Sequence, residues 1–337
     1  MNRTEDLKIH MRKGSAMDTP LYEIQCGSGR GNRLYVKRDD LLPFSLGGNK
    51  VRIGWEFYRD MCRTGSDCMV IYGDSRSNLC RVLGSICHQK RIPCYMLCTN
   101  VEHTGRPASN SRLMKWLHTE VVPCRKDAVA QGVEELLIRL EKEGRKPYYI
   151  YGNKWGEGRE GVPVQAYADA YREILRQEEE MGVHFSHIFV PSGTGATHSG
   201  LIAGDLLAGG KKQIIGISVS RERKRGSRII SRAVQQYFES RGLDQPDQLE
   251  RSIHLEDGYL LGGYGKYDER IEGCIRRQFT LNSLPLDPTY TGKAFWGMEQ
   301  YLQAHGIEDA DILFIHTGGA PLFYDHLTDE KGGAAPC

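Results

Sequence analysis

Lys50 has the sequence setting that most clearly suggests chemistry in this chain. It ends the run Gly47-Gly48-Asn49-Lys50, so a reactive amine stands beside small residues that let the backbone approach a flat ring closely. Much later, a glycine-rich turn follows a strand pattern and opens a helix pattern, with the sequence Ser192-Gly193-Thr194-Gly195-Ala196-Thr197. Such a turn directs backbone N–H groups and a helix dipole at a phosphate. The pair suits an aldehyde cofactor that carries a phosphate and binds lysine, pyridoxal 5′-phosphate.

The same turn leaves a second cofactor open. As a dinucleotide fingerprint it has His198 where the third glycine belongs, and Arg221 follows the next strand pattern where an acid for the ribose is usual. An arginine there can meet a 2′-phosphate, so an NADP-dependent oxidoreductase stays as a weaker alternative. The chain has no GxxxxGK[ST] run, which excludes a P-loop.

The elements that must position these residues alternate between strands and helices. Short apolar runs predict strands at 68–72, 93–97, 121–124, 147–151, 187–190, 214–219 and 312–315. Helical patterns occur at 77–88, 109–118, 128–143, 163–181, 196–207, 227–239, 269–280 and 291–305. This rhythm indicates parallel sheets covered by helices on both faces. Ligands of such sheets bind at the carboxyl ends of strands, so we expect Gly73, Ser192 and Thr317 to converge on one cleft.

Composition narrows the class of protein. The chain has 337 residues, enough for two domains, and its 45 Lys+Arg and 43 Asp+Glu nearly balance, which argues against a nucleic-acid partner. No apolar stretch reaches the ~18 residues of a membrane span, and the charged N-terminus through Lys13 has no secretory signal. The ten cysteines have irregular spacing, so reduced thiols are expected rather than disulfides or a metal site. We therefore expect a cytoplasmic protein without metal, membrane or nucleic-acid binding.

Several blocks of the chain occur in the order typical of one enzyme family. They are the runs at 35–41 and 47–52, the pair Ser77-Asn78, the turn at 192–198, and the blocks at 286–293 and 312–321. Together they resemble the D-cysteine desulfhydrase and 1-aminocyclopropane-1-carboxylate deaminase family of fold type II pyridoxal-phosphate enzymes.

The resemblance implies an α/β fold like that of the tryptophan synthase β subunit, with two domains that each hold a twisted, mainly parallel sheet covered by helices. Residues 1–50 and 161–337 would form the large cofactor-binding domain, and residues 51–160 the small one. The active site would lie in the cleft between them. The resemblance also implies a homodimer.

Roles for individual residues follow from the same resemblance. Lys50 would hold the cofactor as a Schiff base and move the Cα proton of the substrate. Asn78 would bond the phenolic oxygen of the cofactor, and Thr317 its pyridine nitrogen. The cofactor phosphate would be held by the backbone of Gly193, Thr194, Gly195, Ala196 and Thr197.

The substrate would be held on the opposite side of the cofactor. Ser77 would bind its carboxylate, and Tyr264 and Tyr290 would flank it, which makes these three catalytic residues together with Lys50. The full substrate-binding set that the resemblance implies is Ser77, Asn78, Leu79, Trp155, Tyr264 and Tyr290.

The chain also departs from the family pattern. Arg76 and Leu79 replace a glutamine and a histidine or glutamine, and Lys154 and Trp155 lie in a segment that is small and neutral in the family. These changes fit either drift at an exposed rim or recognition of a bulkier or anionic substrate by Arg76, Lys154 and Trp155.

The function that we expect is a pyridoxal-phosphate-dependent lyase, similar to D-cysteine desulfhydrase, that acts on a small amino acid. It would eliminate a β-leaving group and release a keto acid and ammonia. The alternatives are β-replacement through an aminoacrylate, and a non-catalytic protein that binds the cofactor or a metabolite. Ring-opening deamination is disfavoured, because Thr291 stands where the deaminases carry a glutamate.

Overall fold

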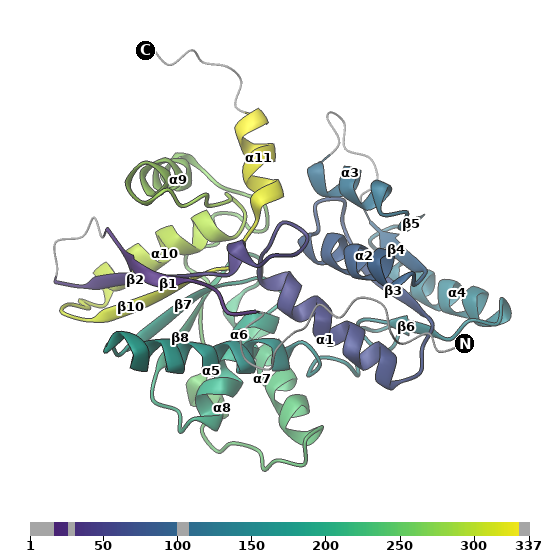
Figure 1. The fold of residues 1–337 in the computed structure, drawn as a ribbon, viewed down its shortest axis with the longest axis horizontal. Coiled ribbons are helices and arrows are strands. Elements are labelled where there is room, and N and C mark those ends of the chain that lie inside the picture. Colours follow the sequence, from purple (N-terminus) through teal and green to yellow (C-terminus); the bar gives the residue numbers. More distant parts are fainter. Residues whose placement is uncertain (1–16, 26–30, 100–107, 330–337) are drawn as a thin grey trace.

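The computed structural model describes residues 17–25, 31–99 and 108–329. Two sheets organise these residues, and Figure 1 shows them on opposite sides of the molecule. The charged N-terminal segment through Lys13 lies outside the described residues.

The larger sheet has six strands in the order β1-β2-β10-β7-β8-β9. All neighbours pair in parallel except β1, which runs antiparallel to β2. The strands are β1 (Leu21–Ile24), β2 (Arg33–Arg38), β7 (His187–Ser192), β8 (Gln213–Ser218), β9 (His254–Glu256) and β10 (Asp311–His316).

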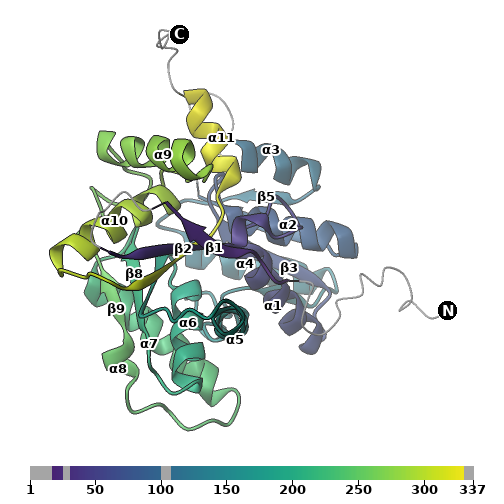
Figure 2. The ribbon, with the colours of Figure 1, turned by 60° about the vertical axis from the view of Figure 1, so that its left-hand side comes forward.

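Both faces of this sheet are buried, as the run of apolar residues in its strands predicts. Along β7, Ile188 and Val190 join one core cluster, and Phe189 between them joins another. Helices α9 and α10 cover one face, and α5, α6 and α7 lie on the other (Figures 1 and 2). The helices of this part are α5 (Val164–Met181), α6 (Ala196–Leu207), α7 (Arg223–Glu239), α8 (Leu249–Ser252), α9 (Glu269–Asn282), α10 (Thr291–Ala304) and α11 (Ala320–Asp329).

The smaller sheet has four parallel strands in the order β5-β4-β3-β6. Val70 of β3 packs with Leu136 of α4, whereas Met69 and Ile71 face the cluster that contains Leu83 of α2. The sheet is therefore also covered on both faces. Its elements are β3 (Cys68–Gly73), β4 (Cys94–Cys98), β5 (Glu120–Pro123), β6 (Pro147–Tyr149), α2 (Asn78–Lys90), α3 (Ser109–Trp116) and α4 (Val129–Lys142).

The short helix η1 (Asp39–Leu41) and helix α1 (Asn49–Arg63) connect the two sheets. One core cluster contains both Met69 of the small sheet and Ile188 of the large one, so the sheets share packing. The predicted α/β fold with two helix-covered, mainly parallel sheets is confirmed. The division into residues 1–50 with 161–337 and 51–160 stays a prediction.

Three further properties concern only the parts of the chain that the structure describes. The eight cysteines there are free thiols. No group of three or more His, Cys, Asp or Glu side chains there could hold a metal ion. None of the helices there combines the length and the apolar character that crossing a membrane requires.

Candidate active site

The backbone before Lys50 passes through a run of left-handed residues. Residues 45–48 all have positive φ, from 44° to 94°. Gly47 is required here, because a Cβ at this position would lie 1.9 Å from the carbonyl oxygen of Asp40. Helix α1 begins immediately after this turn. The glycines therefore fix the point from which the Lys50 side chain leaves the backbone.

The first residue of α1, Asn49, joins the end of β10 to the start of α6. Its N–H donates to the carbonyl oxygen of Thr317, directly after β10, over 3.0 Å. Its side-chain amide donates to Oγ1 of Thr197, in the first turn of α6, over 2.8 Å. The lysine motif, the glycine-rich turn and the end of β10 are thus brought together as the topology predicts.

The Lys50 side chain is half-buried, and its amine makes no hydrogen bond or ion pair with any residue that the structure describes. Loss of solvent lowers the pKa of this amine to about 8. An ordinary lysine has a pKa of about 10.4, so Lys50 has a far larger neutral fraction at pH 7. A neutral amine is the form that attacks a carbonyl carbon.

The glycine-rich turn lies between β7 and α6. Gly195, at the start of α6, has a φ of 95°, which a side chain would strain. A narrow cavity lies beside the turn. Its lining residues are Ser192, Gly193, Thr194, Gly195, Ser218, Arg221, Gly226, Ile230 and Leu255.

Arg221 is the charged residue in the lining of this cavity. Its guanidinium donates to the carbonyl oxygen of Gly193, and the Ser220 hydroxyl donates to the same oxygen over 3.3 Å. Burial lowers the pKa of Arg221, but a guanidinium stays protonated in proteins. With the Gly193 carbonyl held in this way, the N-terminus of α6 and a nearby positive charge favour an anion at the turn.

Ser77 and Asn78 lie at the start of α2, after the end of β3. The Ser77 hydroxyl oxygen accepts a hydrogen bond from the Cys80 N–H over 3.2 Å and so caps the helix. The carbonyl oxygen of the Asn78 side chain accepts from the Asn110 amide over 2.9 Å. Both side chains are half-buried and held in place by these bonds.

Tyr264 and Tyr290 form a pair, with their hydroxyl oxygens 2.9 Å apart and their rings nearly perpendicular. Tyr290 also lies beside the glycine-rich turn, because a Cβ at Gly193 would be 3.3 Å from its ring. Burial raises the pKa of Tyr264 to about 12, and burial also raises the pKa of Tyr290. Both side chains are therefore neutral phenols at physiological pH.

Other predicted residues have different surroundings. Leu79 is half-buried and packs against the main core cluster. Arg76 is exposed, and its positive charge slightly opposes the rise in the pKa of Tyr264 that burial causes, so it lies near that tyrosine. Thr291 is buried, and its hydroxyl donates to the Asp287 carboxylate over 2.9 Å.

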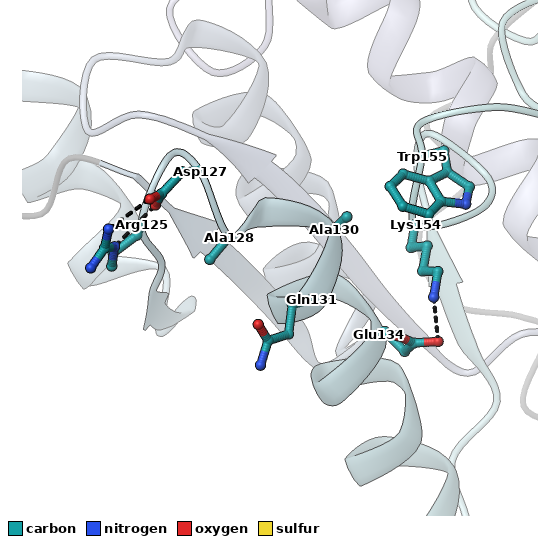
Figure 3. A pocket seen from close by; sticks show the side chains of 8 residues that line it. All are labelled: Arg125, Asp127, Ala128, Ala130, Gln131, Glu134, Lys154 and Trp155. Carbon is teal, nitrogen blue, oxygen red and sulfur yellow. Dashed lines mark hydrogen bonds and ion pairs between the residues drawn. The ribbon is translucent and has the colours of Figure 1, made fainter.

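Trp155 and Lys154 line an open hollow of about 620 Å³ on the small-sheet side of the molecule, shown in Figure 3. Lys154 donates to the Glu134 carboxylate over 2.7 Å, and Trp155 is 70% exposed. The other lining residues are Arg125, Asp127, Ala128, Ala130, Gln131 and Glu134, none of which is a predicted site residue. The structure therefore places these two residues beside the start of α4, and their contact with a substrate stays a prediction.

Comparison with known proteins identifies the chemistry of this arrangement. The sequence model of the pyridoxal-phosphate dependent enzymes matches residues 14–318. The chain belongs to the pyridoxal-phosphate dependent enzyme family. The family match favours pyridoxal phosphate as the cofactor over the alternative of NADP. His198, which occupies the third glycine position of that fingerprint, is a fully buried residue whose Nε2 lies 3.1 Å from the Ile214 carbonyl oxygen.

Two comparisons cover almost the whole chain at appreciable identity. The chain is 31% identical to a D-cysteine desulfhydrase of Klebsiella pneumoniae (strain 342), over 91% of this chain and 93% of that protein. A solved ACC deaminase homologue superimposes with a TM-score of 0.78 at 29% identity, covering 92% of this chain and 93% of the other. A solved O-ureido-L-serine synthase shares the fold, with a TM-score of 0.67, 15% identity and 95% coverage of both chains.

The residues of the site fit pyridoxal 5′-phosphate, the cofactor of this family. Lys50 offers an amine of lowered pKa that pairs with none of the described residues. The turn at 193–197, with Arg221 beside it, has the backbone geometry and the charge that suit a phosphate. Arg221 has a sequence signal, because it follows a strand pattern where nucleotide-binding proteins place a ribose contact. Asn49 has no signal of its own, since its two partners are distant in sequence.

The lowered pKa of Lys50 predicts how cofactor capture depends on pH. Below pH 8 the neutral fraction of the amine falls about ten-fold per pH unit, so attachment of pyridoxal phosphate should slow by that factor from pH 7 to 6 and level off above pH 8. Borohydride reduction followed by peptide mass spectrometry measures attachment at Lys50. A rate that still rises between pH 9 and 10 would show an ordinary lysine pKa.

Proposed function

We propose that this protein is a lyase that removes the β-substituent of a small amino acid, with D-cysteine as the first substrate to test. The observation that carries the proposal is the amine of Lys50, which pairs with none of the described residues. Its neighbour Asn49 bonds to both Thr197 and Thr317 and so places Lys50 next to the glycine-rich turn and the end of β10. The D-cysteine desulfhydrase relatives, similar over most of the chain, support the substrate class.

The cofactor would be held at three places. The backbone at 193–197 and the helix dipole of α6 would bind its phosphate. Asn78 would bond its phenolic oxygen, and the Thr317 hydroxyl would face its pyridine nitrogen. When bound, pyridoxal phosphate withdraws electrons from the amino acid and so makes the Cα proton removable. A hydroxyl supports a protonated pyridine less than a carboxylate does, which favours prompt loss of a leaving group.

The protein's own residues would divide the remaining tasks. Lys50, with a pKa of about 8, can take up and return the Cα proton near neutral pH. Ser77, with the free backbone amides at the start of α2, would bind the substrate carboxylate. Tyr264 and Tyr290, as neutral phenols bonded to each other, would border the β-substituent and can donate a proton to it.

Keto-acid release from D-cysteine tests the proposal. Purified protein loaded with pyridoxal phosphate is expected to give pyruvate, sulfide and ammonia in equal amounts, and protein whose cofactor has been fixed by borohydride is expected to give none. If pyruvate is replaced by a new amino acid when a second thiol is added, the reaction is β-replacement. An intact attached cofactor without either product would contradict both reactions and support a binding protein.

Ring opening of 1-aminocyclopropane-1-carboxylate is not part of the proposal. The Thr291 hydroxyl is buried and donates to Asp287, so this position presents no acid to a substrate. The same assay with that compound as substrate should therefore give no keto acid.

We also propose that the protein works in the cytoplasm as a homodimer. The free thiols among the described cysteines suit a reducing compartment, and the family resemblance suggests the dimer. Sedimentation of the loaded protein should give the mass of two chains, and a single-chain mass at micromolar concentration would exclude the dimer.

A further inference from the structure

Lys293 is a buried lysine that the proposed mechanism does not use. It lies in the first turn of α10, three residues after Tyr290, and is 0% exposed. Burial lowers its pKa to about 8, while the charge of Asp268 acts in the opposite direction. Within the described ranges, no carboxylate lies within ion-pair distance of its ammonium, so a buried charge here needs another reason.

The ammonium of Lys293 is bound by backbone carbonyls instead. Its Nζ donates to the carbonyl oxygens of Leu260 and Gly263, over 2.8 Å each. Both belong to the loop at 257–268, which connects β9 to α9. Charge-assisted bonds of this kind are stronger than neutral ones, which offsets the cost of burying the charge.

Each of the two carbonyl oxygens also accepts the hydrogen bond that closes a turn of the loop. The Gly263 N–H donates to the Leu260 carbonyl over 3.0 Å, and the Lys266 N–H donates to the Gly263 carbonyl over 3.2 Å. Leu261, Gly262, Gly263 and Gly265 have positive φ, from 49° to 111°. A loop with so many glycines has little stiffness of its own, so contacts from outside must fix its shape.

Tyr264 lies within the second of these turns, and its hydroxyl meets that of Tyr290 over 2.9 Å. Tyr290 is the residue that precedes α10, and Lys293 follows in the first turn of the same helix. The start of α10 therefore contacts the loop at two points. One contact is the pair of tyrosine hydroxyls, and the other is the Lys293 ammonium on the carbonyl oxygens of Leu260 and Gly263.

We propose that Lys293 is a positioning residue for Tyr264, and that its ammonium holds the loop at 257–268 in the shape that brings this tyrosine to the substrate. The role at the substrate rests on the proposed function. The shape of the loop does not, so the two can be tested separately.

Limited proteolysis of the cofactor-loaded protein tests the loop directly, because Lys266 is an exposed trypsin site within it. Lys293→Met keeps the length of the side chain and removes its N–H donors, and cleavage after Lys266 is expected to become about ten-fold faster. Lys212→Met is the matched control. It removes another buried ammonium, which donates to Glu178 over 2.7 Å far from this loop, and should leave cleavage after Lys266 unchanged.

If folded Lys293→Met is cleaved after Lys266 as slowly as the wild type, the proposal is wrong. It is also wrong if Lys212→Met speeds this cleavage as much as Lys293→Met does. If Lys293→Met does not fold, Lys293→Gln replaces it. The shorter amide cannot reach both carbonyls as the ammonium does, so faster cleavage is again expected. Wild-type protection in that variant would overturn the proposal as well.

Kinetics with D-cysteine test the link to Tyr264. Lys293→Met should raise KM about ten-fold while the affinity for pyridoxal phosphate stays unchanged, since Lys293 lies outside the cofactor cradle. In a Tyr264→Ala background the same substitution should add no further rise, whereas an additive rise would overturn the link. If the wild-type protein does not act on D-cysteine, the proposed function fails, and the proteolysis still decides the role of Lys293.

Discussion

Replacing Lys50 by alanine is expected to lower turnover of D-cysteine by about ten-thousand-fold or more, because one side chain supplies both the attachment of the cofactor and the transfer of the Cα proton. The neighbouring cation Arg52 cannot take over these tasks, because a guanidinium stays protonated. Arg52, two residues on, is bound to Asp39 and Glu173 by ion pairs of 3.1 and 2.9 Å. Steady-state assay of keto acid measures the loss.

The comparison variant is Lys142→Ala, at the exposed end of α4, which should retain wild-type turnover. Borohydride treatment gives a second readout that does not depend on the substrate. It should attach pyridoxal phosphate to Lys50 in the wild-type protein and to no single lysine in Lys50→Ala. Stable attachment at another position, or turnover within ten-fold of the wild type, would remove Lys50 from its assigned role.

The site could be predicted where the chemistry coincides with local sequence. Lys50 and the turn at 193–197 are marked by glycines, and the strand patterns place Gly73, Ser192 and Thr317 at strand ends. Parallel strands bring such ends to one edge of a sheet. The topology therefore explains why the strand ends at Ser192 and Thr317 lie close to Lys50. The match with the pyridoxal-phosphate dependent enzymes confirms the cofactor.

Sequence patterns did not reveal the short edge elements. Strand β9 has three residues and β1 has four, and both are too short for a periodic pattern. Strand β1 is defined by antiparallel pairing with β2, which is a tertiary contact rather than a local preference.

Local sequence patterns also do not predict contacts between residues that are distant in the chain. Lys293 is an ordinary lysine in the sequence, and only the fold shows that it binds two loop carbonyls. The surroundings of Trp155 are likewise set by the fold. Its place in the hollow beside α4 depends on how the segment at 152–158 folds back on itself through the bridge between Gly152 and Gly158.

A buried group of four charged side chains includes Arg52 of α1, the helix that carries Lys50. Asp39 and Glu173 face Lys37 and Arg52, and all four side chains are buried. Asp39 also accepts hydrogen bonds from the hydroxyl of Thr19, over 2.8 Å, and from that of Tyr167. The group therefore connects η1, α1 and α5, and its two negative and two positive charges balance.

Replacing Asp39 by asparagine is expected to lower the free energy of unfolding by about 3–5 kcal/mol, because it leaves an uncompensated positive charge in the interior. Desolvation by itself raises the pKa of Asp39, but the charges of Arg52 and Lys37 outweigh it, so its pKa lies below the ordinary value. A carboxylate with a depressed pKa stabilises the fold above its unfolded pKa, about 3.9, and loses that contribution as pH falls through the folded pKa.

Urea unfolding of both proteins at several pH values measures this effect. The difference in stability between wild type and Asp39→Asn should be constant above about pH 5 and should shrink as the pH falls below 4. Asp18→Asn is the matched control, because Asp18 pairs with Arg176 over 2.6 Å at the surface and should cost about 0–1 kcal/mol. An equal, small loss in both variants would mean that the buried charges contribute little. Arg52 of α1 belongs to this group of charges. A large loss of stability in Asp39→Asn alone would therefore show that the group stabilises the helix that carries Lys50.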